Sequence, residues 1–216
     1  MPRLRQIPRA EVSGDVLAAY ERLFPGRDPV TEPGTATGTP GNWWTVFANS
    51  PEVLQHAQLG FALLRSDAFK VTPYQRELGQ LRAGFVQGSK FVFSQHSKGA
   101  RRAGISAEKV AAIPSWTSSP LFDPMERAIL GYTDELVLAD GRVQDGTFEE
   151  LRKYLSDEGI LQFTYATCMY AMHATISRAL RLEYDDVDER IAEVPAPTGA
   201  DGVDIMASIS AESPQT

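Results

Sequence analysis

Few side chains in this sequence have the chemistry needed for catalysis near neutral pH. There are three histidines, His56, His96 and His173, and a single cysteine, Cys168. An imidazole titrates close to neutral pH and can carry protons, whereas one cysteine cannot form an intrachain disulfide. The composition therefore excludes chemistry that needs two thiols in one chain.

The surroundings of these residues suggest a role for each. Cys168 lies in an apolar run, and a free cysteine behaves as a small hydrophobe, so we expect it to be buried and unreactive. His56 takes a polar position on an amphipathic stretch, which indicates a surface role. His173 lies on an apolar helix and needs a partner if it is buried, so it is either a core histidine or a pocket-lining one.

Glu77 and His96 each lie about one turn into a predicted helix. Considered alone, Glu77 is expected to be a solvent-exposed charged residue on a helix, and His96 is expected to have a structural role. They belong to different helices, so their spacing alone does not bring them together. Three scattered histidines with no HxH or HxxxH spacing also argue against a zinc site.

Composition excludes several classes of function. The chain has 216 residues, is 43% hydrophobic and 23% charged, and carries a formal net charge of -7. An acidic surface repels phosphate backbones, so we expect no nucleic-acid partner. No stretch approaches the roughly 20 apolar residues of a membrane span, and the first residues do not resemble a signal peptide. We expect a cytoplasmic protein that does not bind membranes.

Helix-starting signals recur along the chain, and no convincing strand pattern appears. A capping residue followed by proline, or by Glu or Gln three residues later, is typical of a helix N-terminus. The sequence therefore predicts an all-α fold. Helices are predicted to start at Ser50, Thr72, near Ser89, at Ser106, Asp123 and Thr147, with a last apolar helix over about residues 157–182.

Three regions are predicted along the chain. Residues 1–42 form an N-terminal segment with one weakly amphipathic stretch and a long Gly- and Pro-rich loop. Residues 43–190 form a helical domain that opens with an aromatic cluster. Residues 191–216 are rich in Pro, Ala, Gly and Ser, which favours a flexible C-terminal tail.

Several short motifs resemble the carboxymuconolactone decarboxylase and alkylhydroperoxidase D-like family, over roughly residues 43 to 186. They occur in the order that the family has them. The resemblance implies an alkylhydroperoxidase D-like helical bundle. The motifs are Ser50–Leu54, Thr72–Leu78, Gly88–His96, Ala100–Ser106, Asp123–Leu130 and Tyr132–Leu136.

The chain departs from the family where its peroxidases carry their two redox cysteines. Ser89 and Val92 stand at those positions, so the resemblance implies a cysteine-less member without dithiol chemistry. The glutamate and histidine of the family's proton relay are kept as Glu77 and His96. Phe91 stands between the missing cysteines and implies a more apolar pocket.

The resemblance implies a catalytic pair of His96 and Glu77. Apolar surroundings are expected to raise the pKa of the carboxyl, and a carboxylate orients an imidazole. Arg82 is a candidate to hold a substrate carboxylate, because a guanidinium binds one bidentately, and the alternative for it is a surface salt bridge. The other expected substrate-binding residues are Ser89, Phe91, Phe93, Trp44, Tyr170 and His173.

Three functions remain open on the sequence. The first is a cofactor-free, decarboxylase-like lyase or an isomerase that uses the Glu77–His96 pair on a small organic acid, lactone or cyclic carbonyl compound. The second is a ligand-binding member of the fold without turnover. The third is a peroxide-related oxidoreductase, which needs Cys168 exposed next to His96. The resemblance also implies a homo-oligomer, a trimer or a hexamer, and we expect no cofactor and no metal.

Overall fold

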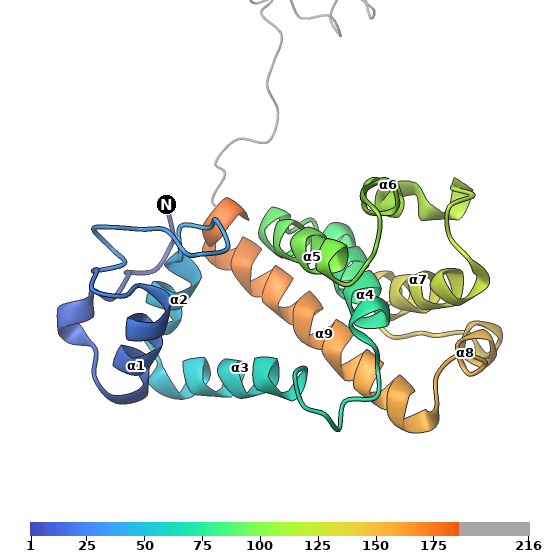
Figure 1. Cartoon of the computed structure of the whole chain (residues 1–216), viewed down its shortest axis with the longest axis horizontal. Helices are drawn as coiled ribbons and strands as arrows, with labels where there is room; N and C mark the ends of the chain where they lie inside the picture. The colour runs from blue at the N-terminus through green and yellow to red at the C-terminus, as the bar shows by residue number, and fades with distance from the viewer. Residues whose placement is uncertain (186–216) are drawn as a thin grey trace, which may run out of the picture.

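A long helix, α9 (Asp157–Leu180), runs diagonally through the computed structural model (Figure 1). The structure describes residues 1–185, so the tail predicted at 191–216 lies outside the described residues. Helices α4, α5 and α7 pack against α9. The N-terminal helices lie at one end of the molecule, and α6 to α8 lie at the other.

The predicted all-α class is confirmed, because the described residues contain helices and no strand. Loops join the helices, and residues 1–185 also contain short 3-10 segments at Arg9–Glu11, Ile113–Ser118 and Glu183–Asp185. The other helices are α1 (Gly14–Leu23), α2 (Asn42–Phe47), α3 (Pro51–Leu63), α4 (Pro73–Val86), α5 (Lys90–Arg102), α6 (Ala107–Ala112), α7 (Pro124–Leu138) and α8 (Asp145–Leu151).

Capping side chains set most of the helix starts. Thr72 and Asp123 each form a complete capping box, with Gln75 and Glu126 as the reciprocal partners. The predicted start at Thr147 is wrong by two residues. The Thr147 hydroxyl donates to Glu135 at 2.8 Å and so does not cap the helix, and α8 begins earlier.

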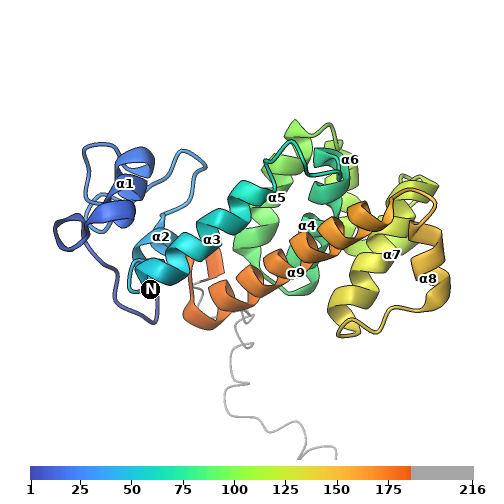
Figure 2. The ribbon, with the colours of Figure 1, turned by 90° about the horizontal axis from the view of Figure 1, so that it is seen from below.

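Three hydrophobic clusters hold the described helices together, and two of them are large. One joins α4, α7 and α9 through residues such as Leu78, Ile129 and Phe163. The other joins α1, α2 and α3, with Tyr20 and Trp43 at its centre. The N-terminal segment therefore shares a core with the helices that follow it, and α3 lies alongside α9 (Figure 2). The domain division at residue 42 stays a prediction.

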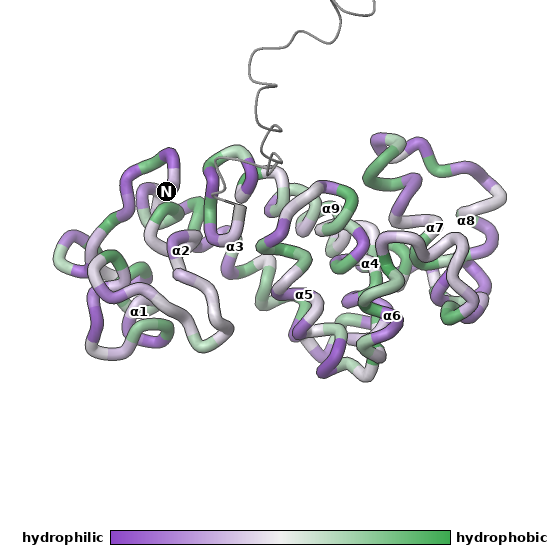
Figure 3. Tube along the Cα trace, turned by 90° about the horizontal axis from the view of Figure 1, so that it is seen from above, coloured by the Kyte–Doolittle hydropathy of each residue, from purple (hydrophilic) through white to green (hydrophobic). Residues whose placement is uncertain are grey.

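No helix in residues 1–185 is long and apolar enough to cross a membrane. Hydrophobic and hydrophilic stretches alternate along the chain (Figure 3). This patterning suits helices that bury one face and leave the other face in water.

Gly79 lets α4 and α9 approach closely, and this predicts a stability effect. A Cβ at Gly79 would lie 2.5 Å from Phe163 Cζ and 2.9 Å from Thr167 Oγ1. Such overpacking costs about 1–3 kcal/mol, so Gly79→Ala should lower the free energy of unfolding by that amount in urea titrations. Gly146→Ala is the control, because a Cβ there meets nothing within 4 Å. Equal stability of the two variants would contradict this packing.

Candidate functional site

Helix α4 carries Glu77 into the interior. The capping box at Thr72 and the proline at the first turn fix where this helix begins. Glu77 lies just beyond the first turn and is 8% exposed, so its carboxylate is almost wholly removed from water. A buried carboxylate needs partners of its own, because an unpaired buried charge is costly.

Helix α5 places His96 opposite Glu77. The Ser89 side chain accepts a hydrogen bond from the Val92 amide and caps the start of this helix. Gly99 lies one turn beyond His96, and a Cβ there would lie 2.4 Å from Glu77 Oε2. The missing side chain at Gly99 therefore leaves the space that the Glu77 carboxylate occupies.

The two predicted catalytic residues meet. His96 Nδ1 lies 2.8 Å from Glu77 Oε2, and both side chains are buried. Arg76 contributes a second, longer contact of 3.4 Å to the other carboxylate oxygen. With Nδ1 bound to the carboxylate, Nε2 is the imidazole nitrogen left to meet a ligand.

The pKa of the Glu77 carboxyl is lowered, contrary to expectation. Burial raises this pKa, but the hydrogen bond and charge of His96, together with the Arg76 guanidinium, outweigh burial. Glu77 is therefore a carboxylate at neutral pH and accepts the hydrogen bond from His96. The prediction of a raised pKa is wrong, because it considered the apolar surroundings without the cationic partners.

The pair forms part of the wall of a cavity of about 530 Å³. Aromatic side chains make up much of the remaining lining. The Tyr170 ring meets the His96 ring edge-on, with centroids 4.2 Å apart. Burial, and then the Glu77 charge, raise the pKa of Tyr170 to about 12, so its hydroxyl stays protonated. The other aromatic lining residues are Trp43, Trp44, Phe61 and Phe91.

His173 lines the same cavity in an unusual state. It is 3% exposed, and neither of its ring nitrogens has a hydrogen-bond partner. Burial, and then the charge of nearby His96, lower its pKa to about 4. At neutral pH it is thus an uncharged imidazole with one free donor and one free acceptor. Gln80 adds a buried amide whose oxygen and nitrogen are both unpartnered.

Comparison with known proteins agrees with this arrangement of helices. Residues 55–135 match the carboxymuconolactone decarboxylase family. An uncharacterised Bacillus subtilis protein, YdfG, is 25% identical over 84 residues, which are 38% of this chain. The match spans 57% of the length of that relative.

Solved structures show the same fold. A protein of unknown function from Agrobacterium tumefaciens, proposed to be the antioxidant defence protein AhpD, is 26% identical with a TM-score of 0.58, covering 68% of this chain and 96% of its own. A peroxidase-related protein from Ralstonia eutropha JMP134, with an alkylhydroperoxidase AhpD core, has a TM-score of 0.68 at 15% identity. The match covers 84% of this chain and 90% of that protein. The structure of the debrominase Bmp8 with 2,3,4-tribromopyrrole has a TM-score of 0.61 at 17% identity. The match covers 84% of this chain and 92% of the Bmp8 chain.

Arg82 does not reach the cavity, which corrects the prediction that it binds substrate. Its guanidinium makes two hydrogen bonds to Asp134, of 2.6 and 3.0 Å, and others to the carbonyls of Ile113 and Pro114. Trp116 also donates to Asp134. Arg82 thus ties α4 to α7 and to the 3-10 segment before it.

Two more predicted binding residues lie outside the cavity lining. Ser89 is buried and serves as the cap of α5. Phe93 packs against the hydrophobic cluster that joins α4, α7 and α9, and its ring centroid lies 6.0 Å from that of Phe85. The remaining predicted binding residues, Trp44, Phe91, Tyr170 and His173, do line the cavity.

Cys168 is exposed rather than buried, so that prediction is wrong. Cys168 lies on α9 and lines another hollow, which His56 and Met172 also line. Burial of its surroundings still raises the pKa of the thiol, which disfavours the reactive thiolate. Cys168 is not among the lining residues of the cavity that holds Glu77 and His96, which is called the acid–base cavity below.

Several lining residues were missed at the level of sequence. Gln80 follows Glu77 by three positions, and Gly99 and Arg102 follow Gln95 on one face of α5, so helical spacing could have revealed them. Arg22, Thr37 and Arg65 come from other segments and carry no such signal. Thr37 shows that the Gly- and Pro-rich loop covers part of the cavity.

No cluster of three or more His, Cys, Asp or Glu side chains within residues 1–185 could hold a metal ion.

The neutral state of His173 predicts a loss of stability in acid. The unfolded chain binds this proton near pH 6.5, and the folded chain near pH 4. The stability linked to this group is therefore fully present above pH 6.5 and is lost as the pH falls towards 4, by about 3 kcal/mol. His173→Phe should lack this loss when urea unfolding is compared at neutral pH and near pH 4.

Thr175→Val, an exposed change on the same helix, is the control and should follow the wild type. If His173→Phe loses stability in parallel with the wild type, the imidazole is not neutral in the folded protein.

Proposed function

We propose that this protein is a cofactor-free enzyme that moves a proton to or from carbon in a small organic acid, lactone or cyclic carbonyl compound. Decarboxylation is the reaction we favour, with isomerisation as the variant. The observation that carries the proposal is the buried Glu77–His96 hydrogen bond in the wall of the cavity. General acid–base help of this kind is worth about 10²–10⁴-fold in rate.

In the proposed decarboxylation, the bond between carbon and the leaving carboxylate breaks and carbon dioxide departs. The electron pair moves onto a neighbouring carbonyl and forms an enolate. His96, protonated on Nε2, then gives that proton to carbon and regains one from water. Glu77 keeps Nδ1 protonated throughout and stabilises the positive imidazolium that exists before the transfer and after the ring regains its proton.

The two unpartnered polar groups support a carbonyl-containing substrate. The neutral His173 ring and the Gln80 amide can each donate a hydrogen bond to a carbonyl oxygen without bringing a charge. Donors aimed at an oxygen that gains charge stabilise an enolate. Buried polar atoms without a hydrogen-bond partner in the protein are costly, and such a ligand would give them partners.

The alternative without turnover is a ligand-binding protein of the same fold. It predicts binding of the same compounds with no product. A peroxide-related role is the weaker alternative. The relatives described as peroxidase-related favour it. The positions of Ser89, Val92 and Cys168 do not, because no pair of thiols faces His96 among the cavity-lining residues.

The proposal predicts deuterium transfer to carbon that depends on His96. Purified protein would be incubated in D₂O with carboxylated lactones and β-keto acids, and carbon dioxide and product deuteration would be measured. We expect one deuteron at carbon for each carbon dioxide released. His96→Gln should lower kcat by about 10²–10⁴-fold, because it removes the proton carrier. Glu77→Gln should also lower kcat.

Cys168→Ala is the matched control and should keep full turnover, since that thiol lies in another hollow. Loss of activity in the cysteine variant with its fold unchanged would overturn the acid–base mechanism. Binding without product in the wild type would favour the ligand-binding alternative.

We also propose that the chain forms a homo-oligomer. Large apolar side chains are exposed on neighbouring helices, including Leu59 on α3 and Leu161 and Met172 on α9. Exposed apolar surface of this kind favours burial against another copy. Sedimentation velocity should give a trimer or a hexamer, and Leu161→Glu should weaken it. A monomeric wild type would contradict this assembly.

A further inference from the structure

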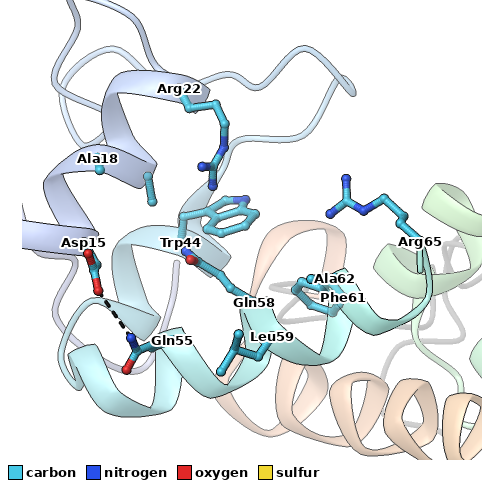
Figure 4. Close-up of a pocket in the computed structure, with 11 residues that line it drawn as sticks. Asp15, Ala18, Arg22, Trp44, Gln55, Gln58, Leu59, Phe61, Ala62 and Arg65 are labelled. Carbon is cyan, nitrogen blue, oxygen red and sulfur yellow. Dashed lines mark hydrogen bonds between the residues drawn. The ribbon is translucent and has the colours of Figure 1, made fainter. Parts of the chain in front are cut away.

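A second hollow, of about 570 Å³, adjoins the acid–base cavity on the side of the N-terminal segment. It lies between α1 and α3 (Figure 4). Arg22, Trp44, Phe61 and Arg65 line both spaces. The two hollows therefore meet at these four residues, and a ligand in one can extend into the other.

Two guanidinium groups face this junction without partners. Arg22 and Arg65 are exposed, and neither guanidinium makes a hydrogen bond or an ion pair with any residue in the part of the chain that the structure describes. Arg76, in the same cavity, is instead bound by the Leu64 carbonyl at 2.7 Å and by Glu77. Arg22 and Arg65 are thus cations still available to a ligand.

The geometry around Trp44 suits a planar anion. Figure 4 shows the Arg22 side chain extending from α1 down to the indole of Trp44, and the Arg65 side chain pointing towards the same indole from the end of α3. Trp44 is itself held edge-on by Trp43, with centroids 4.9 Å apart. Guanidinium groups bind carboxylates through paired hydrogen bonds, and an indole offers a flat apolar surface.

The other charges nearby do not satisfy these cations. Asp15 is the carboxylate among the residues that line the outer hollow, and it bonds Gln55 at 3.3 Å, away from Arg22 and Arg65 (Figure 4). The chain as a whole carries a net charge of -7. Two unpaired cations that converge on one aromatic ring stand out against this acidic background, and an anion between them would relieve their repulsion.

The junction is also coupled to the acid–base pair. The Arg65 charge lowers the pKa of Tyr170, against the larger effects of burial and Glu77 that raise it. Tyr170 in turn meets the His96 ring. Arg65, Tyr170 and His96 all line the same cavity, so one ligand can contact both Arg65 and His96.

We propose that Arg22, Trp44 and Arg65 form an anion subsite that binds the carboxylate end of a planar organic acid. The rest of that molecule extends into the cavity towards His96. This inference rests on the proposed function for the reaction, whereas the binding itself does not require turnover. The subsite assigns a recognition role to the N-terminal segment, which lies outside the matched residues 55–135.

Isothermal titration calorimetry with 2-naphthoate as the probe and uncharged 2-naphthamide as its isostere tests the subsite. The full-length wild type should bind the acid at least about tenfold more tightly than the amide, because charge-assisted hydrogen bonds are the strong ones. Arg22→Gln and Arg65→Gln should each weaken 2-naphthoate binding by about tenfold or more, with little effect on 2-naphthamide.

Arg101→Gln is the matched control, because Arg101 is exposed on α5 and lines neither hollow. It should bind 2-naphthoate as the wild type does. Equal affinity for acid and amide, or unchanged affinity in both Arg22→Gln and Arg65→Gln, would overturn the anion subsite. No binding of 2-naphthoate to the wild type would overturn it as well.

The same titration with His96→Gln separates this inference from the proposed reaction. Retained 2-naphthoate binding in that variant, together with its loss in Arg65→Gln, supports the subsite whether or not the wild type shows turnover. If 2-naphthoate binding depends on His96 and not on either arginine, the anion lies in the acid–base cavity and the subsite is wrong.

Discussion

The close approach of α4 to α5 is the constraint on which the rest of the site depends. The Glu77 carboxylate lies where a side chain at Gly99 would otherwise be, 2.4 Å from the position of its Cβ. Gly84 allows a similar approach, with Val92 Cγ1 2.8 Å from its Cβ position. Only this spacing lets His96 Nδ1 come within 2.8 Å of Glu77. The glycines therefore act on the chemistry through geometry and need not contact a ligand.

The same burial that shapes the cavity gives its titratable groups different roles. Glu77 has cationic partners, so its pKa falls and it remains a carboxylate. The ring nitrogens of His173 have no hydrogen-bond partner, and burial together with the charge of nearby His96 lowers its pKa to about 4, which keeps it neutral. Two histidines on one cavity wall thus differ: His96, the proposed proton carrier, is braced by a carboxylate, whereas His173 is an uncharged hydrogen-bonding group. Their environments, not their residue type, assign these roles.

Sequence reasoning could predict what depends on local pattern. Capping residues and prolines located the starts of α4 and α7, and the motif order identified the family and the Glu77–His96 pair. Arg82 was misassigned, because its partner Asp134 lies 52 positions away and only the folded chain brings the two together. The exposure of Cys168 was missed for a related reason: α9 is apolar on most faces, and helical periodicity does not say which face a neighbouring helix covers.

The site is assembled from three parts of the chain. Glu77, Gln80 and His96 lie within the matched segment 55–135, which holds the proposed acid–base pair. Trp44 and Arg22 come from the N-terminal residues, and His173 comes from α9. A change in the N-terminal residues alters the mouth of the cavity without disturbing the α4–α5 contact that holds the acid–base pair. Substrate choice can therefore change in this architecture while the position of the proton carrier stays fixed.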